Sequence, residues 1–167
     1  NYRALGACPN LMSIVVDEEN KYLDSRNNCN AVISSNDTYR PANQLVAGCK
    51  TTVIPNSVTE IGDYAFVRCE TLENIIIPEG VTTIGNSAFG YCESLASLKI
   101  PNSITNIGED AFGYCSSLYK IFNNSELMLD IGSEDYGKIA YYAQMIIDRN
   151  GKKSYRKDGS EYIETED

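Results

Sequence analysis

Cysteine has the most reactive side chain in this sequence, which contains six cysteines. Four of them occupy the same position of a repeated motif: Cys8, Cys69, Cys92 and Cys115. No two cysteines form the C-x-x-C pattern of a zinc site. Equivalent side chains of stacked repeats run parallel, so disulfides among these four would be strained, and buried free cysteine packs as a small hydrophobe. We expect buried thiols, and we leave open a disulfide between Cys29 and Cys49 across a hairpin.

The remaining reactive residues do not form a recognisable catalytic site. The chain has no histidine, which removes Ser-His and Cys-His dyads and imidazole metal ligands. The adjacent pairs Glu109-Asp110 and Glu134-Asp135 have side chains that diverge, so they do not suit paired-carboxylate chemistry. The acidic run Asp17–Asn20 lacks the spacing and the glycine of an EF-hand loop. We therefore expect no enzyme activity, no cofactor and no metal site.

A 23-residue motif, present in three consecutive copies, must position these side chains. In the middle copy its constant residues are Ile77-Pro78, Ile84-Gly85, Ala88-Phe89, Cys92 and Leu95. A repeat of this length predicts a solenoid, whose coils bury their apolar faces by stacking on one another. Proline and glycine suit the corners of each coil, and the phenylalanines, leucines and isoleucines would form ladders along a continuous core.

Each copy is preceded by a short strand with Leu-x-x-Ile-x-Ile spacing. Alternation places Leu72, Ile75 and Ile77 inward and the intervening residues outward. The candidate binding residues are the outward ones, which differ between copies: Asn74, Ile76, Ser97, Lys99, Lys120 and Phe122, with Tyr119 adjacent. Ile76 and Phe122 are large apolar groups on a face that needs only polar ones, which favours a contact surface. Burial of Phe122 under a flanking loop or a further module is the alternative.

The sequence divides into five segments. We expect a partial repeat (1–15), a long variant repeat with a β-hairpin insert (16–53), three regular repeats (54–122), a divergent or capping helical unit (123–147) and a polar hairpin-like tail (148–167). Ala31–Ile33 and Gln44–Ala47 have strand-like compositions, with Pro41 in the loop between them. Apolar residues at helical spacing predict a longer helix over Ser133–Ile147.

The composition disfavours two classes of partner. The net charge is −9, whereas nucleic acids and anionic membrane surfaces require clustered lysine and arginine. No run approaches the ~18 apolar residues of a membrane-spanning helix. The sequence begins in mid-repeat, so we expect a piece of a longer protein; the alternative is a true N-terminus that starts with half a repeat.

The repeats closely resemble the BspA-like, or Treponema-type, leucine-rich repeat family. From Ile54 to Phe122 they match its pattern, I-P-x-x-V-x-x-I-G-x-x-A-F-x-x-C-x-x-L-x-x-I, nearly residue for residue. The resemblance implies an α/β leucine-rich-repeat solenoid, a right-handed coil with short strands and short helical turns. It also implies a secreted or cell-surface protein of anaerobic bacteria, and the family has no shared catalytic motif.

Two functions stay open. One is a non-enzymatic extracellular or cell-surface binding module whose strand face holds a protein or glycan ligand. The other is a structural spacer that displays other domains and has no ligand of its own.

Overall fold

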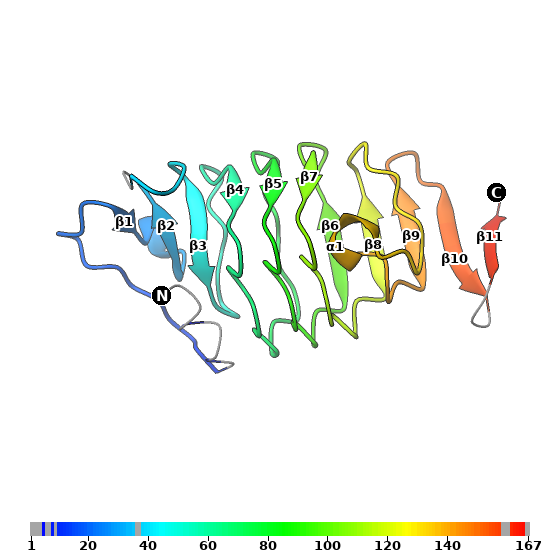
Figure 1. Cartoon of the computed structure of the whole chain (residues 1–167), viewed down its shortest axis with the longest axis horizontal. Helices are drawn as coiled ribbons and strands as arrows, with labels where there is room; N and C mark the ends of the chain where they lie inside the picture. Colours follow the sequence, from blue (N-terminus) through cyan, green and yellow to red (C-terminus); the bar gives the residue numbers. More distant parts are fainter. Residues whose placement is uncertain (1–4, 6–7, 9, 36–37, 158–160, 166–167) are drawn as a thin grey trace.

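The computed structural model describes residues 5, 8, 10–35, 38–157 and 161–165. Part of the expected N-terminal partial repeat, Asn36-Asp37 of the expected insert and Asp158-Gly159 of the expected tail lie outside these residues. The described residues form an elongated solenoid, with β1 near one end and β11 at the other (Figure 1). The predicted solenoid is therefore confirmed, whereas the division into five segments stays a prediction.

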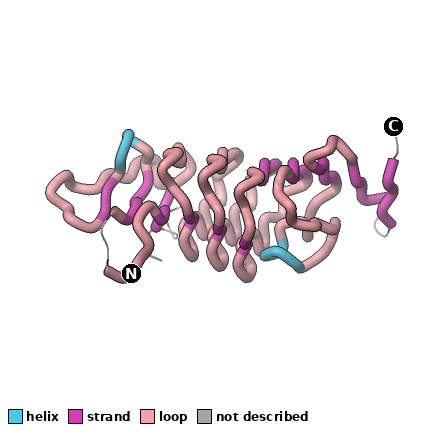
Figure 2. The backbone as a smooth tube through the Cα atoms, turned by 90° about the horizontal axis from the view of Figure 1, so that it is seen from above, coloured by secondary structure: helices cyan, strands magenta, loops and turns pink. Residues whose placement is uncertain are grey.

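Two sheets run along the solenoid, on opposite sides of its coils (Figure 2). The first has the order β1 (Leu23–Asp24), β2 (Ala31–Ser34), β3 (Gln44–Gly48), β4 (Glu60–Ile61), β5 (Thr83–Ile84) and β7 (Asn106–Ile107). The second has the order β6 (Ser97–Ile100), β8 (Lys120–Asn123), β9 (Met145–Asp148), β10 (Lys153–Lys157) and β11 (Glu161–Thr165). Strands of successive coils pair in parallel, as β3 to β7 and β6 to β9 do.

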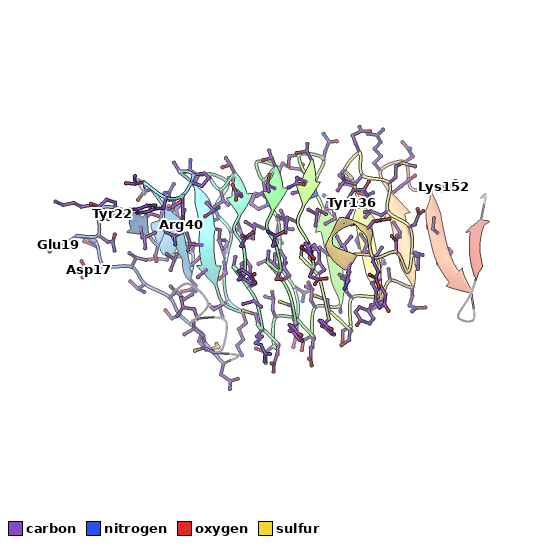
Figure 3. The ribbon with its side chains drawn as sticks, in the orientation of Figure 1. Asp17, Glu19, Tyr22, Arg40, Tyr136 and Lys152 are labelled. Atoms are coloured by element: carbon purple, nitrogen blue, oxygen red, sulfur yellow. The ribbon has the colours of Figure 1, made fainter. Side chains whose placement is uncertain are left out.

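The expected hairpin insert is present at the N-terminal end. Strands β1, β2 and β3 pair antiparallel, with a register shift between Val32 and Ile33. Pro41 lies in the loop between β2 and β3, and the backbone N–H of Asn43 donates to Ser34 O at 2.7 Å to close this loop. Figure 3 shows Arg40 and Tyr22 at this end of the molecule.

The core is a ladder of side chains from equivalent repeat positions. Phe66, Phe89 and Phe112 are fully buried. Their rings stack at centroid distances of 4.9 and 5.1 Å, with interplanar angles of 4° and 8°. Stacking of identical coils brings identical rings into register, which is the phenylalanine ladder that the repeat predicts.

The segments expected to form short helical turns are hydrogen-bonded turns that face the next coil. The backbone N–H of Phe66 donates to Ala88 O at 2.6 Å, and that of Phe89 donates to Ala111 O at 2.7 Å. A left-handed φ of 61° recurs at the equivalent residues Arg68, Tyr91 and Tyr114. These left-handed residues interrupt any regular helix, so alternate backbone donors bind the next coil and the others bind within their own turn.

The helix predicted over Ser133–Ile147 is wrong. Within this segment the only helix is the short α1 (Asp135–Lys138), in which Tyr136 and Gly137 are left-handed, and β9 begins at Met145. Tyr136 lies on α1, in front of the C-terminal coils (Figure 3). The segment completes another coil because Gly137 O accepts the N–H of Phe112 at 2.8 Å and β9 pairs with β8.

The C-terminal tail contains the expected hairpin. Strands β10 and β11 pair antiparallel, and β10 also pairs antiparallel with β9. Lys152 precedes β10 (Figure 3). The tail therefore extends the second sheet beyond the last coil.

Candidate functional site

The predicted binding residues lie in register along the second sheet. We call this surface the strand face: the outward residues of β6, β8 and β9, together with Asn74 and Ile76 of the preceding coil. Ser97 pairs with Lys120 and Lys99 with Phe122, and these continue to Met145 and Ile147 of β9. The pairing brings Ser97, Lys99, Lys120 and Phe122 together, whereas Asn74 and Ile76 precede the first strand of the sheet.

Apolar side chains on the strand face are open to solvent to different degrees. Ile76 is 85% exposed and Tyr119 is 52% exposed. Phe122 is half-buried, because Lys120 Nζ lies 4.7 Å from its ring centroid and Ile147 is its neighbour in β9. The Lys120–Phe122 contact has the geometry of a cation–π interaction, which holds the ammonium group on this face.

Two shallow hollows border these residues. One, of about 400 Å³, is lined by Val53, Ile76 and Pro78 together with Asn56 and Asn74. The other, of about 760 Å³, is an open hollow whose lining includes Tyr119, Tyr142, Gln144, Ser94, Ser117 and Glu73. Many binding surfaces combine apolar side chains with hydrogen-bonding groups in this way.

Sequence reasoning missed part of this surface. Val53, which is 71% exposed, lies one repeat before Ile76, and Tyr142 lies one repeat after Tyr119, so the 23-residue period could have found both. Ile147 pairs with Phe122 in spite of a longer spacing. Because the sequence predicted a helix over this region, Met145 and Ile147 were not recognised as strand residues.

A second aromatic ladder lies on the turns. The rings of Tyr91 and Tyr114 stack at 4.5 Å with an interplanar angle of 9°. The guanidinium of Arg68, one repeat earlier, lies 5.0 Å from the Tyr91 centroid. These contacts join equivalent turns of three coils, which is a structural role for this row.

Three of the four cysteines at the repeated position, Cys69, Cys92 and Cys115, are buried thiols within the core. Cys92 Sγ lies 3.2 Å from Phe66 O, and Cys115 Sγ lies 3.1 Å from Phe89 O, in each case in the preceding coil. Burial raises the pKa of Cys69 and of Cys115 to about 12 and the pKa of Cys92 well above its ordinary value. Thiols that stay protonated are poor nucleophiles and poor metal ligands.

The other three cysteines are one exposed residue and two buried residues of the insert. Cys8 is exposed, so the expectation of burial is wrong there; no coil among the described residues precedes it to cover the side chain. Cys29 and Cys49 of the insert are buried free thiols, which point to the backbone oxygens of Ala31 and Asn30 at 3.7 and 3.5 Å. Burial also raises the pKa of Cys29.

The part of the chain that the structure describes contains no group of three or more Cys, Asp or Glu side chains arranged to hold a metal ion. No helix in the same residues has the length and hydrophobicity that crossing a bilayer requires.

Comparisons with known proteins agree with the fold. A leucine-rich repeat protein from Eubacterium ventriosum is 23% identical, covers 83% of this chain and 36% of its own, and superposes with a TM-score of 0.64. A leucine-rich cell surface protein from Faecalibacterium prausnitzii is 24% identical, with coverages of 84% and 42% and a TM-score of 0.52. The pneumococcal vaccine antigen PcpA is 16% identical, with coverages of 82% and 39% and a TM-score of 0.53. The present chain thus spans less than half the length of each of these structures.

The sequence comparison is more specific. No curated protein matches the chain. The pattern of the BspA type leucine rich repeat region matches residues 45–143, in six copies. Repeats of this kind typically form binding modules and not active sites. Since the match covers more than half of the 167 residues, the chain belongs to the BspA-type leucine-rich repeat family.

Proposed function

We propose that this chain is a non-enzymatic binding module of a secreted or cell-surface protein, and that its ligand binds the strand face. The observation that carries the proposal is the row Ile76, Lys99, Phe122 and Ile147, which crosses neighbouring coils on one side of the molecule. Identical repeat residues are used by the core, so specificity is left to outward residues that vary. The apolar side chains of this row, exposed at Ile76 and half-buried at Phe122 and Ile147, lie outside the core and are available for contact.

The chemistry of the strand face favours a polypeptide ligand. Outward positions of β6, β8 and β9 include Lys99 and Lys120 and no carboxylate, although the whole chain has a net charge of −9. Ile76, Phe122 and the hollow beside Val53 offer apolar contacts. A segment with apolar and acidic side chains would complement both features. A glycan ligand would instead use the polar hollow beside Tyr119.

A surface location is supported by relatives. One similar structure is of a cell surface protein and another is of a vaccine antigen. We extend this location to the present chain as part of the proposal.

Binding to immobilised protein and glycan panels, followed by alanine substitution of Ile76, Lys99 and Phe122, tests the proposal. We expect weaker binding with little change in melting temperature. Thr83→Ala is a matched control, because Thr83 points outward from the opposite sheet. A ligand whose affinity is unchanged by all three substitutions contradicts the strand-face assignment. A chain that binds no panel member supports the spacer function instead.

A further inference from the structure

One row of equivalent repeat positions beside the strand face carries side chains of very different size. Successive coils place Glu73, Ala96, Tyr119 and Tyr142 at this position, each 23 residues after the last. All four line the open hollow of about 760 Å³. Ala96 contributes only a methyl group, so the row is interrupted between the longer side chains of Glu73 and Tyr119. We call this interruption the notch.

The spacing of the coils sets the width of the notch. Equivalent rings in adjacent coils of the core lie 4.9 and 5.1 Å apart. Glu73 and Tyr119 are two coils apart, so their backbones are separated by roughly 10 Å along the solenoid, twice the spacing of neighbouring strands. Atoms in contact are about 4 Å apart. The notch therefore admits one ligand side chain in contact with both of its sides.

Both sides of the notch are open to a ligand. The Tyr119 side chain is 52% exposed and Glu73 is exposed. The Tyr142 ring packs edge-on against Tyr141, with centroids 4.9 Å apart, instead of stacking on Tyr119. Within the described residues, neither the Tyr119 side chain nor the Glu73 carboxylate forms a hydrogen bond, ion pair or ring contact.

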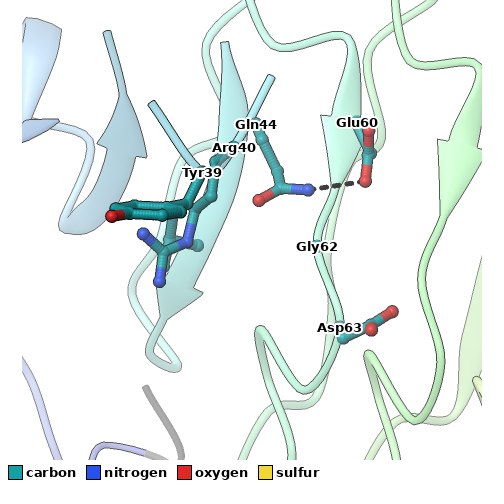
Figure 4. A pocket seen from close by; sticks show the side chains of 7 residues that line it. Tyr39, Arg40, Gln44, Glu60, Gly62 and Asp63 are labelled. Carbon is teal, nitrogen blue, oxygen red and sulfur yellow. Dashed lines mark hydrogen bonds between the residues drawn. The ribbon is translucent and has the colours of Figure 1, made fainter. Parts of the chain in front are cut away.

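The pocket of about 320 Å³ between the hairpin insert and the first regular coil differs in this respect. Tyr39 and Arg40 at its border already interact with other groups, and Gln44 Nε2 donates to Glu60 Oε1 (Figure 4). The notch, in contrast, presents a ring and a carboxylate that the fold does not use.

The charge of the notch favours a cationic ligand. Glu73 is the single charged residue among the described residues that line it. Lys120 follows Tyr119 in the sequence, but its ammonium group lies over the ring of Phe122, which is not part of the lining. The carboxylate would repel an anion, whereas an ammonium or guanidinium group would form a charge-assisted hydrogen bond with it.

The other lining groups suit the same ligand. A cation beside the face of a tyrosine ring is attracted by the ring electrons, and a guanidinium also stacks on the ring. The hydroxyls of Ser94, in the coil of Ala96, and of Ser117, in the coil of Tyr119, can accept its remaining N–H donors.

We propose that the notch binds the basic side chain of an arginine or lysine from a polypeptide, between the Tyr119 ring and the Glu73 carboxylate. The proposal rests on the proposed polypeptide ligand of the strand face, to which it adds a basic residue beside the apolar and acidic ones.

Titration of the full, ¹⁵N-labelled chain with small blocked amino acids, followed by two-dimensional NMR, tests this. The cationic probes are Nα-acetyl-arginine amide and Nα-acetyl-lysine amide. Nα-acetyl-citrulline amide is the neutral analogue of the first, and methyl β-glucoside is the sugar probe. We expect saturable shifts of the Ala96, Ser117 and Tyr119 amide signals with the cationic probes. The affinity for the citrulline probe should be about fivefold or more weaker, and added salt should weaken binding of the cations.

Four substitutions separate the contributions. Glu73→Gln should remove the preference for arginine over citrulline. Tyr119→Ala should weaken binding of both probes, whereas Tyr119→Phe keeps the ring and the binding. Ala96→Tyr fills the notch and should abolish binding in folded protein, since Tyr119 and Tyr142 already occupy this position in later coils. Glu109→Gln is the matched control, because this exposed carboxylate follows β7 of the opposite sheet and its loss should change nothing.

Three results would overturn the proposal. One is that no cationic probe shifts these signals, or that citrulline binds as tightly as arginine. Another is that arginine binds folded Glu73→Gln and Ala96→Tyr proteins as it binds the unaltered chain. The third is that the glucoside alone shifts the same signals, which would indicate a sugar site. None of these rejects the strand face, because that assignment is tested separately with a ligand from the panels and the Ile76, Lys99 and Phe122 substitutions.

Discussion

The thiol of Cys92 lies 3.2 Å from the backbone oxygen of Phe66, and the ring of Phe66 stacks on that of Phe89. Cys115 repeats the contact one coil later, with Phe89 O at 3.1 Å. A cysteine and a phenylalanine from adjacent coils are therefore joined at the centre of the core. This contact explains why cysteine recurs with the period of the repeat although no disulfide joins these residues.

The buried thiols should make the fold sensitive to alkali. Burial raises the pKa of Cys69 and Cys115 from 9.0 to about 12, so the folded state keeps protons that the unfolded state loses. Their contribution is fully present below about pH 9, and the free energy of unfolding should fall as the pH rises from there towards 12. Urea denaturation at a series of pH values measures this. A Cys69→Ala, Cys115→Ala variant should show a shallower decline, and an equal decline contradicts the assignment.

The same burial should suppress alkylation. In native buffer near pH 8 we expect Cys69, Cys92 and Cys115 to react with iodoacetamide far more slowly than in urea, because the thiolate is the reactive form. Peptide mass spectrometry measures the labelling of each residue. Rapid labelling of Cys92 in folded protein would show that the core opens readily.

Two phenylalanines offer a direct comparison of core and surface. Phe89→Ala removes the middle ring of the stack and should lower the free energy of unfolding by about 3–5 kcal/mol. Phe122→Ala removes a half-buried outward ring and should cost roughly 1 kcal/mol. Urea denaturation of both variants measures the difference. Equal losses would contradict the inward and outward assignment of these residues.

The sequence predicted the regular coils of the solenoid but not the structure of the last coil. Alternation correctly separated inward from outward residues, because each coil is stabilised by its neighbours and the repeat positions keep their roles. Ile139, Ala143 and Ile146 are buried as expected, yet in turns and a strand instead of a helix. Apolar spacing over such a short segment does not distinguish these structures, and hydrogen bonds to the preceding coil decide the outcome.

The candidate sites were only partly visible in the sequence. Asn74, Ile76, Ser97, Lys99, Tyr119, Lys120 and Phe122 followed from the period, and the structure adds their continuation into β9. A pocket of about 320 Å³ where the hairpin insert meets the first regular coil could not be predicted. Tyr39 and Glu60 are distant in the sequence, and their approach depends on the path of a loop outside the repeat.

Close packing against α1 should make one glycine irreplaceable. Gly137 has a φ of +64°, and a Cβ there would lie 2.3 Å from Gly108 O. Gly137→Ala should therefore destabilise the protein by roughly 2 kcal/mol or more. Gly151 has a φ of +83° with no atom within 4 Å of a Cβ, so Gly151→Ala should cost about 1 kcal/mol from backbone strain alone. Thermal denaturation compares the two; equal losses would contradict the packing of α1 on the Gly108 turn.

The strand face should separate binding from stability. Ile76→Asp places a carboxylate on an 85% exposed side chain, so it should leave the melting temperature almost unchanged. For an acidic polypeptide ligand it should weaken binding by about tenfold or more, through lost apolar contact and charge repulsion. Lys99→Glu should act in the same direction and make the residual binding less sensitive to salt. Surface plasmon resonance at two ionic strengths measures both effects, with Thr83→Asp on the opposite sheet as the matched charge control. If Thr83→Asp weakens binding as much as Ile76→Asp does, net charge and not the strand face governs recognition.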